Sequence, residues 1–349
     1  MQTNKYVDFK SLAGIFIVFI SVVYILIIGK SLIMPFVFAL LLWLIVKQIR
    51  LFMNRIRFVE KMVPEWVKNL ISFVIILLVL NFIVNIVLTN LLVLAITYEG
   101  YLENIDRLIN RVNETFNIDL LASMQIYFQD FDFGSVAFSI INFSSGLLGT
   151  VFIMIVYTIF IFIEEASFRK KLHKVLSDNQ KFEDTYRLIE KVERSVSKYL
   201  VLKTLICLLT GILSYFVLIA IGVDFPVFWA FLIFLLNYIP VLGSYVATIL
   251  PVLFSFLQFG EFGPGLLVLI FVGAIQVTIG NFIDPRIMGS SVNLSPLVII
   301  LSLAFWGAIW GVVGMFLSVP LMVIVVSVFS KMPRFRPFAI LMTGDGEID

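Results

Sequence analysis

The sequence contains few charged residues and very few residues that bind metals or form disulfides. Of its 349 residues 14% are charged, one is cysteine and one is histidine. The single cysteine, Cys207, excludes a disulfide within the chain and a thiolate metal cluster, and the single histidine, His173, excludes a site built from several histidines. The net charge of +2 gives no indication of a nucleic-acid partner.

Enzyme motifs are also missing from the sequence. No glycine-rich loop is followed by Lys and Ser or Thr, so this chain by itself is not predicted to hydrolyse ATP. His173 lies among Lys170, Lys171 and Lys174, which leaves no Ser-His-Asp arrangement and no histidine-glutamate spacing typical of a metal site. The sequence therefore predicts a protein that is not an enzyme and has no cofactor.

Hydrophobic residues, in contrast, are present in large excess. They make up 61% of the chain, including 36 phenylalanines, and the mean hydropathy is +1.07. Soluble domains are about half apolar and about a quarter charged, so a soluble globule of this composition would expose too much apolar surface to water. The composition predicts a polytopic membrane protein surrounded by the lipid bilayer.

Apolar runs of about 20 residues, the length that crosses a bilayer, recur along the chain. Candidate spans are 12–29, 32–46, 70–97, 137–163 and 199–222, followed by the apolar blocks 226–259, 263–283 and 296–329. The first run is too long for the apolar part of a signal peptide and no small-residue cleavage site follows it, so it is predicted to be a span.

Lys and Arg are distributed unevenly over the polar segments. Residues 47–69 carry six and residues 164–198 carry nine, whereas residues 98–135 carry two beside seven acidic residues. Because cytoplasmic loops carry the excess of Lys and Arg, both termini and the two basic loops are predicted to face the cytoplasm.

Helical spacing of apolar residues predicts an amphipathic outer helix at 101–116 and a cytoplasmic helical pair at 165–199.

The blocks 226–259 and 296–329 resemble each other. Each begins with proline and is too long for one span but too short for two. Two half-helices of about 14 residues, or roughly 21 Å each, fit a re-entrant hairpin better than two crossings; a long kinked helix is the alternative. The predicted hairpin tips are Pro240 and Gly243 in the first block, and Gly307, Gly311 and Gly314 in the second.

The charge rule makes the first hairpin enter from outside and the second from inside, which is the pattern of an inverted-repeat transporter. The predicted fold is an all-α polytopic integral membrane protein with about six full spans and two oppositely oriented re-entrant hairpins, or alternatively about eight spans. The predicted divisions are spans 1–3 (1–97), an extracytoplasmic amphipathic segment (98–136), span 4 (137–163), cytoplasmic helices (164–198), a transport core (199–330) and a cytoplasmic tail (331–349).

Several motifs resemble the autoinducer-2 exporter family. They are SVSKYLVLKT (195–204), NYIPVLG (237–243), NFIDPRIMG (281–289), LSLAFWG (301–307) and GMFLSVP (314–320). The resemblance implies a multi-pass transporter of the bacterial inner membrane and suggests a homo-oligomer, with a pentamer as one form. Members of the family are assigned autoinducer-2 export, which belongs to quorum sensing, or sodium–proton antiport. Asp284 stands where many members have Glu, which preserves the charge.

Charged and polar residues near the apolar blocks are candidates for a substrate or ion pathway, because buried charges are costly. Asp284 and Arg286 are predicted either to neutralise each other as a strut or to let Asp284 bind a proton or cation. Lys203 either extends to the headgroups or interacts with the substrate or Asp284. The uncharged candidates are Asn237, Gln276 and Asn281. Glu164 and Glu165, at the end of the fourth span, are predicted to be solvated.

Three transport functions follow from these residues, with a structural scaffold as the alternative to transport. Export of a small polar signal molecule needs hydrogen-bonding groups such as Asn237, Gln276 and Asn281. Antiport of sodium or lithium against protons needs a titratable carboxylate, which Asp284 provides. A channel-like facilitator is the third, and a structural scaffold would tolerate neutral residues at Asp284 and Arg286.

Overall fold

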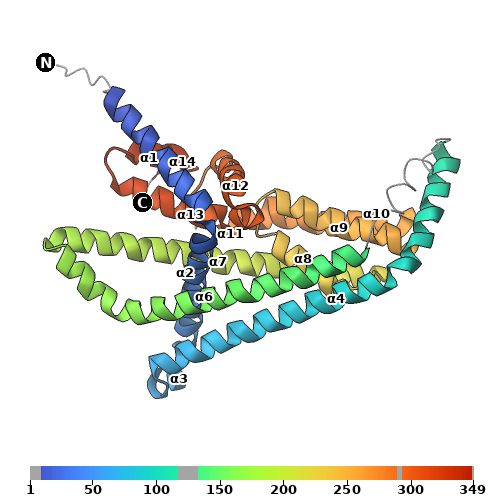
Figure 1. Ribbon diagram of the computed structural model, residues 1–349, viewed down its shortest axis with the longest axis horizontal. Helices are drawn as coiled ribbons and strands as arrows, with labels where there is room; N and C mark the ends of the chain where they lie inside the picture. Colours follow the sequence, from blue (N-terminus) through green and yellow to red (C-terminus); the bar gives the residue numbers. More distant parts are fainter. Residues whose placement is uncertain (1–8, 117–132, 289–292, 348–349) are drawn as a thin grey trace.

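The computed structural model describes residues 9–116, 133–288 and 293–347, and every regular element in these ranges is a helix (Figure 1). The predicted all-α class is confirmed. The helices are α1 (Phe9–Ile28), α2 (Lys30–Met53), α3 (Arg57–Met62), α4 (Glu65–Phe116), α6 (Phe133–Val175), α7 (Asn179–Ile221), α8 (Pro226–Leu236), α9 (Leu242–Phe259), α10 (Phe262–Thr278), the π-helical turn η1 (Ile279–Ile283), α11 (Asp284–Met288), α12 (Pro296–Trp310), α13 (Val312–Lys331) and α14 (Arg336–Met342).

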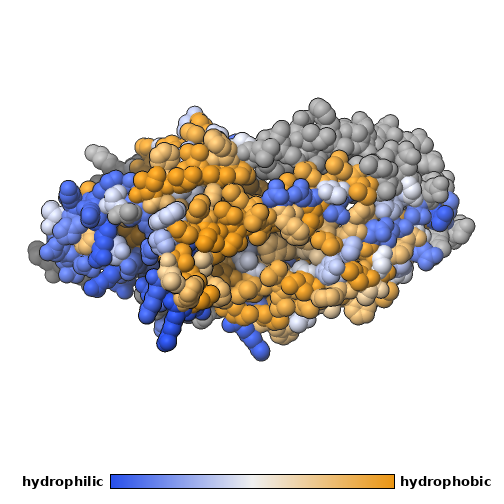
Figure 2. Space-filling model, turned by 90° about the horizontal axis from the view of Figure 1, so that it is seen from below, coloured by the Kyte–Doolittle hydropathy of each residue, from blue (hydrophilic) through white to orange (hydrophobic). Residues whose placement is uncertain are grey.

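Six helices in the described ranges are long and apolar enough to cross a membrane. They are α2, the Glu65–Val93 part of α4, α7, α9, the continuous stretch Phe262–Met288, and α13. A seventh candidate is α6, which bends by 65° between Gly149–Glu165 and Ser167–Val175. Figure 2 shows hydrophobic residues over the middle of the molecule and hydrophilic residues gathered toward both ends of its long axis. Such a surface suits a bilayer.

The polar segments predicted beside the spans continue directly from them. The predicted span 70–97 and the amphipathic segment 101–116 form one helix, because α4 runs for 52 residues without interruption. Between residues 93 and 116 this helix contains no proline and one glycine, Gly100, and a single glycine does not end a helix of otherwise good formers. The predicted cytoplasmic pair is formed by the end of α6 and the start of α7.

Both ends of α7, the helix that carries Lys203, are fixed by local hydrogen bonds. At its start the Asp178 carboxylate accepts the backbone N–H groups of Gln180, at 2.9 Å, and Lys181, at 3.4 Å. At its end Gly222 has a φ of +85°, and Val223 donates its N–H back to the Leu218 carbonyl at 3.0 Å. This left-handed glycine closes the helix and turns the chain toward α8.

The two proline-initiated blocks are helical hairpins. In the first, α8 and α9 fold back on each other, and the rings of Trp229 and Phe254 lie 5.0 Å apart. In the second, Ser302 of α12 donates a hydrogen bond of 3.0 Å to the carbonyl of Ser318 in α13. The halves are unequal, with 11 and 18 residues in the first hairpin and 15 and 20 in the second. The expectation of equal halves of about 14 residues is therefore wrong, and α9 and α13 are each long enough to cross a membrane.

The hairpin turns use different backbone devices. Pro240 cannot continue α8, and Leu242 donates its N–H to the Pro240 carbonyl at 2.7 Å across a γ-turn whose central residue, Val241, has φ +63° and ψ −67°. A positive φ is costly for a β-branched residue. The second turn is made by Gly311 alone, at φ +64° and ψ −145°, a conformation open essentially to glycine.

The glycines that begin the returning helices allow close packing. A Cβ atom added to Gly243 would lie 1.8 Å from the carbonyl oxygen of Leu236, and one added to Gly314 would lie 1.9 Å from that of Trp306. The remaining predicted tip glycine, Gly307, lies inside α12, where an added Cβ atom would lie 2.9 Å from the Met315 side chain. The two hairpins thus share a glycine within the first turn of the second helix, pressed against the backbone of the first.

The C-terminal segment holds the entrance of the second hairpin. Ser295, just before α12, donates its N–H to the Met342 carbonyl at 3.0 Å, and Gly344 donates to the Asn293 side chain at 3.0 Å. Asn293 in turn donates to Asp345, which holds the pKa of that exposed carboxyl below its ordinary value. The tail therefore packs on the hairpin that precedes it.

Candidate functional site

A buried ion pair joins α7 to the end of the α10 span. Lys203 Nζ donates to Asp284 Oδ2 at 2.8 Å, and the two side chains are 8% and 25% exposed. A lysine so deeply buried needs a partner, because an isolated ammonium in an apolar environment loses its proton or destabilises the fold. Of the two sequence-based interpretations of Lys203, the structure shows the interaction with Asp284.

The direction of Asp284 follows from the π-helical turn before it. Pro285 has no N–H, and in an α-helix its ring would clash with the carbonyl of Asn281, four residues earlier. The turn η1 widens the helix at this point, and Asp284 donates its N–H to the Ile279 carbonyl, five residues earlier. The helix can thus continue through a proline, and the carboxylate at its start faces α7.

The predicted strut between Asp284 and Arg286 is not formed. Arg286 is exposed, and the Asp284 carboxylate pairs with Lys203 instead. The reason is helical geometry: residues two positions apart point about 200° away from each other, so their side chains do not meet. Pro285 between them does not bring the two side chains together, because residues 284–288 remain helical through the proline.

The two hairpins meet beside this ion pair. The ring of Tyr238, in the first hairpin turn, lies 4.8 Å from the ring of Phe316 in α13. The Tyr238 hydroxyl is 2.7 Å from the Thr204 hydroxyl, and Thr204 donates to the Leu200 carbonyl at 2.6 Å. Since Thr204 uses its proton on Leu200, Tyr238 is the donor to Thr204. A cavity of about 260 Å³ lies against this contact, lined by Leu200, Thr204, Tyr238 and Phe316 among others.

The uncharged candidates do not gather around one point. The Asn237 amide donates to the carbonyl of Ile233 in its own helix at 2.8 Å, which helps to end α8. Asn281 is exposed on η1. Gln276 is buried in α10, and its Nε2 atom has no hydrogen-bond partner among the residues that the structure describes. Gln276 is therefore a buried donor available to a polar ligand or water.

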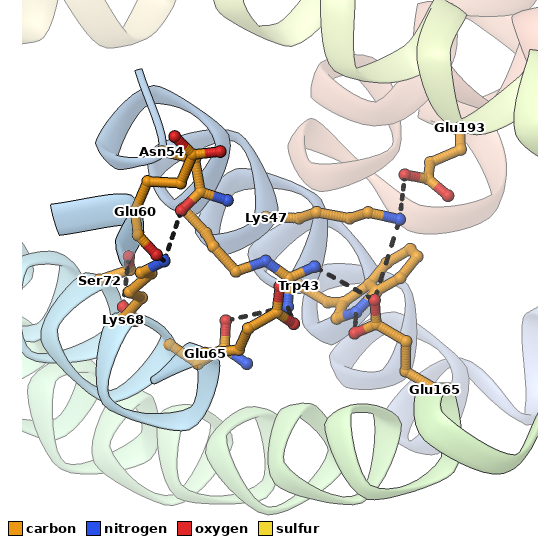
Figure 3. A network of polar contacts seen from close by, with 11 residues as sticks. Trp43, Lys47, Asn54, Glu60, Glu65, Lys68, Ser72, Glu165 and Glu193 are labelled. Carbon is orange, nitrogen blue, oxygen red and sulfur yellow. Dashed lines mark hydrogen bonds and ion pairs between the residues drawn. The ribbon is translucent and has the colours of Figure 1, made fainter. Parts of the chain in front are cut away.

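A second polar site, the Glu165 network, joins four helices (Figure 3). The carboxylate of Glu165, on α6, accepts hydrogen bonds from Trp43 at 2.8 Å and from Arg50 at 3.3 Å, both on α2. Lys47, also on α2, lies 2.5 Å from Glu193 of α7 and 3.9 Å from Glu165. The three α2 residues share one face because they are spaced four and three positions apart.

The same network reaches α4. Arg50 donates to the Asn69 side chain at 3.2 Å and lies 3.9 Å from Glu65. Next to it the Lys68 ammonium donates to Asn54 at 2.7 Å, which closes the corner between α2 and α4 (Figure 3). Charges from α2, α4, α6 and α7 thus neutralise one another at one end of the spans.

The expectation that Glu164 and Glu165 are both solvated holds for the first residue only. Glu164 is exposed and pairs with Lys171, whereas Glu165 is bound by α2. We expect Glu165→Gln to lower the stability of the folded protein by about 1 kcal/mol, because it weakens charge-assisted hydrogen bonds that are partly screened by solvent. Thermal unfolding in detergent measures this, with Glu164→Gln as the matched control. Equal melting temperatures for the two variants would contradict the role of the network.

Sequence reasoning missed Thr204, Tyr238, Phe316 and Glu165. Thr204 and Tyr238 do lie within the motifs 195–204 and 237–243, but nothing in either motif shows that the two hydroxyls meet. The only sequence signal for the Glu165 network is the helical spacing of Trp43, Lys47 and Arg50 near the end of an apolar run.

Comparison with known proteins gives one consistent family. The family model described as AI-2E family transporter matches residues 14–334. The chain is 33% identical over 296 residues to a Haemophilus influenzae protein named "Putative transport protein", an alignment that covers 82% of this chain and 84% of that protein. It is 34% identical over 242 residues to AI-2 transport protein TqsA of Escherichia coli, an alignment that covers 69% of this chain and 68% of that protein. The matched region contains both hairpins, the Lys203–Asp284 pair and the Glu165 network, and the chain belongs to the AI-2E transporter family.

Proposed function

We propose that this protein is a secondary transporter of the bacterial cytoplasmic membrane that moves a small polar signal molecule out of the cell. The observation that carries the proposal is the contact between the two hairpins, Tyr238 against Phe316. Thr204 binds Tyr238 and directly follows Lys203, so the hairpin contact and the buried ion pair share one turn of α7.

Broken helices support transport because the backbone groups released at a break can contact a polar substrate. In the proposed cycle the hairpins separate at Tyr238 and Phe316 in one state and meet in the other. When the Lys203–Asp284 pair opens, each charge needs a new partner, and polar groups of the substrate supply it. The buried Nε2 donor of Gln276 adds a hydrogen bond, while Asn237 and Asn281 remain proposed contacts further along the pathway.

The proposal includes the orientation and assembly expected from the sequence. Both termini face the cytoplasm, the hairpins enter from opposite sides as an inverted repeat, and the protein is a homo-oligomer, with a pentamer as the expected form. The charge difference between residues 98–135 and 164–198 supports the orientation.

The substrate is tested by flux into and out of proteoliposomes. AI-2, the molecule in the name of the E. coli relative, is loaded inside and its efflux is compared with sodium- or lithium-dependent proton movement in the same vesicles. We expect saturable AI-2 efflux that Asp284→Asn abolishes and that Arg286→Gln, an exposed neighbour, leaves intact. Cation-dependent proton movement without AI-2 flux would instead identify an antiporter, and non-saturable flux would identify a channel.

Antiport is the weaker of these functions on the geometry. A carboxylate that exchanges sodium for protons must be available to both ions, and Asp284 is paired with Lys203 at 2.8 Å. The structure offers no second buried carboxylate beside it among the described residues.

The orientation gives a prediction of its own. In a Cys207→Ser background, Asn110→Cys on α4 should react with an impermeant maleimide from outside the cell, and Val175→Cys at the end of α6 only after permeabilisation. Both positions are exposed. Val175 is preferred to the nearby Asp178 because the Asp178 side chain caps α7 and its replacement would disturb that helix. Labelling of both from outside would overturn the orientation and the inverted repeat derived from it.

A further inference from the structure

A large cavity separates α2, α4 and α7. Its volume is about 990 Å³, at the upper end of the range of about 300–1,000 Å³ that holds small molecules. Its walls are formed mainly by Leu, Ile and Val residues, such as Ile76 on α4 and Val201 on α7. An apolar cavity of this size is unsuitable for a hydrophilic solute, because few of the solute's polar groups would find partners.

Two polar residues of the wall, Arg55 and Ser197, bear on the choice of ligand. Arg55, which follows α2, lines the cavity with an exposed guanidinium, and none of the ion pairs in the described chain involves it. Ser197 of α7 also lines the cavity, is 2% exposed, and its hydroxyl has no hydrogen-bond partner among the described residues. An unpartnered buried hydroxyl is rare in folded proteins.

The charge at Arg55 selects the class of ligand. Arginine binds phosphate with two parallel hydrogen bonds, and basic residues at the cytoplasmic surface of a membrane attract anionic headgroups. Arg55 belongs to the basic loop 47–69 that is predicted to face the cytoplasm. The cavity therefore combines an apolar interior with a cationic mouth at the level of the cytoplasmic leaflet.

We propose that this cavity binds an anionic phospholipid of the cytoplasmic leaflet, with one acyl chain between α2, α4 and α7 and the phosphate at Arg55. Thr204 and Tyr238 also line the cavity, so the bound chain lies against the contact between the hairpins. This lipid site is independent of the proposed signal export, since it requires neither flux nor a particular substrate.

The test measures the lipid that stays bound to the full-length protein. The protein is reconstituted in nanodiscs with equal amounts of phosphatidylglycerol and phosphatidylethanolamine, re-extracted in mild detergent, and analysed by native mass spectrometry. We expect the wild type to retain phosphatidylglycerol. Arg55→Gln should lose about fivefold of the preference for it, the effect of one basic residue near a membrane surface. Arg57→Gln, an exposed neighbour outside the cavity, should keep that preference.

A second pair of variants tests the acyl chain. Ile76→Trp fills the cavity from α4 and should remove the retained lipid, whereas Val74→Trp lies on the exposed side of the same helix and should not. Val201→Trp fills the cavity from α7 and provides a second blocking variant in case the first does not fold. The comparison is made only between variants that elute as a single species in size-exclusion chromatography.

Three results would overturn the lipid site. Equal lipid retention in Ile76→Trp and Val74→Trp would show that no chain occupies the cavity. Displacement of the lipid by millimolar inorganic phosphate alone would show that only a free anion is recognised. Absence of lipid in the wild type, with cross-linking of Phe52→Cys to a second copy in a Cys207→Ser background, would assign the cavity to a neighbouring protomer.

Discussion

Replacing Lys203 with methionine is expected to stop transport and to lower the stability of the fold by about 3 kcal/mol. Removal of one partner from a buried pair typically costs about 3–5 kcal/mol, and the lower end applies because a quarter of the Asp284 side chain is exposed. Methionine is unbranched like lysine and only one heavy atom shorter, so the loss reports mainly the charge. Thermal unfolding in detergent and flux in proteoliposomes measure the two effects.

A double variant separates the structural role of the pair from its role in transport. Lys203→Met with Asp284→Leu leaves no unpaired charge, and replacing a buried pair by apolar residues is often neutral for stability. We expect this protein to melt close to the wild type but to remain inactive. Arg286→Gln is the control, because Arg286 lies on the same short helix, is exposed and takes no part in the pair.

Two outcomes would contradict this role. Normal flux in the stable double variant would reduce the pair to a structural contact. An Asp284→Asn variant that folds and transports at the wild-type rate, and loses only the dependence of that rate on pH, would replace substrate binding by proton coupling as the function of the carboxylate.

Alanine in place of Gly314 or Gly243 is expected to have the second-largest effect. The new Cβ would lie 1.9 Å and 1.8 Å from backbone carbonyl oxygens, so the two helices of the hairpin must move apart. Overpacking of this kind costs about 1–3 kcal/mol, and in this protein it also displaces the contact between Tyr238 and Phe316. We expect membrane insertion to persist and transport to fall at least tenfold in both variants, with a complete block in Gly243→Leu.

The matched control is Gly273→Ala on α10. A Cβ atom there meets nothing within 4 Å, and alanine is about 0.5–1 kcal/mol better than glycine within a helix. This variant should therefore melt at the wild-type temperature or above it and transport normally. Full activity of Gly243→Leu would show that the first hairpin does not need its close approach to transport the substrate.

Both predictions depend on contacts that appear only between distant parts of the chain. From the sequence, the Lys203 ammonium is expected either in the headgroup region or beside a partner inside the protein. Its burial against Asp284 depends on the packing of α7 against the α10 span, 81 residues apart in sequence. The sequence suggested an ion pair between Asp284 and Arg286 because the two residues are close along the chain. The pair does not form because helical residues two positions apart point in different directions.

The sequence by itself determined the class of the protein, its membrane location and the segments in which helices break. Long apolar runs have to be helical in lipid, since every backbone hydrogen bond must be made within the segment. Pro240 interrupts a helix for reasons of local geometry and was recognisable without a structure, whereas the choice of Gly311 among Gly307, Gly311 and Gly314 was not.

Only the tertiary structure decided the lengths of the hairpin halves, the partners of Lys203 and Glu165, and the meeting of Tyr238 with Phe316. Both hairpin blocks are apolar throughout, so hydropathy does not indicate at which residue each hairpin turns or which of its helices is longer. Partner choice among charges depends on helix rotation and register, which change the direction of a side chain by about 100° for each residue. The sequence thus indicated that Lys203 and Asp284 need partners, and packing determined which partners they and Glu165 have.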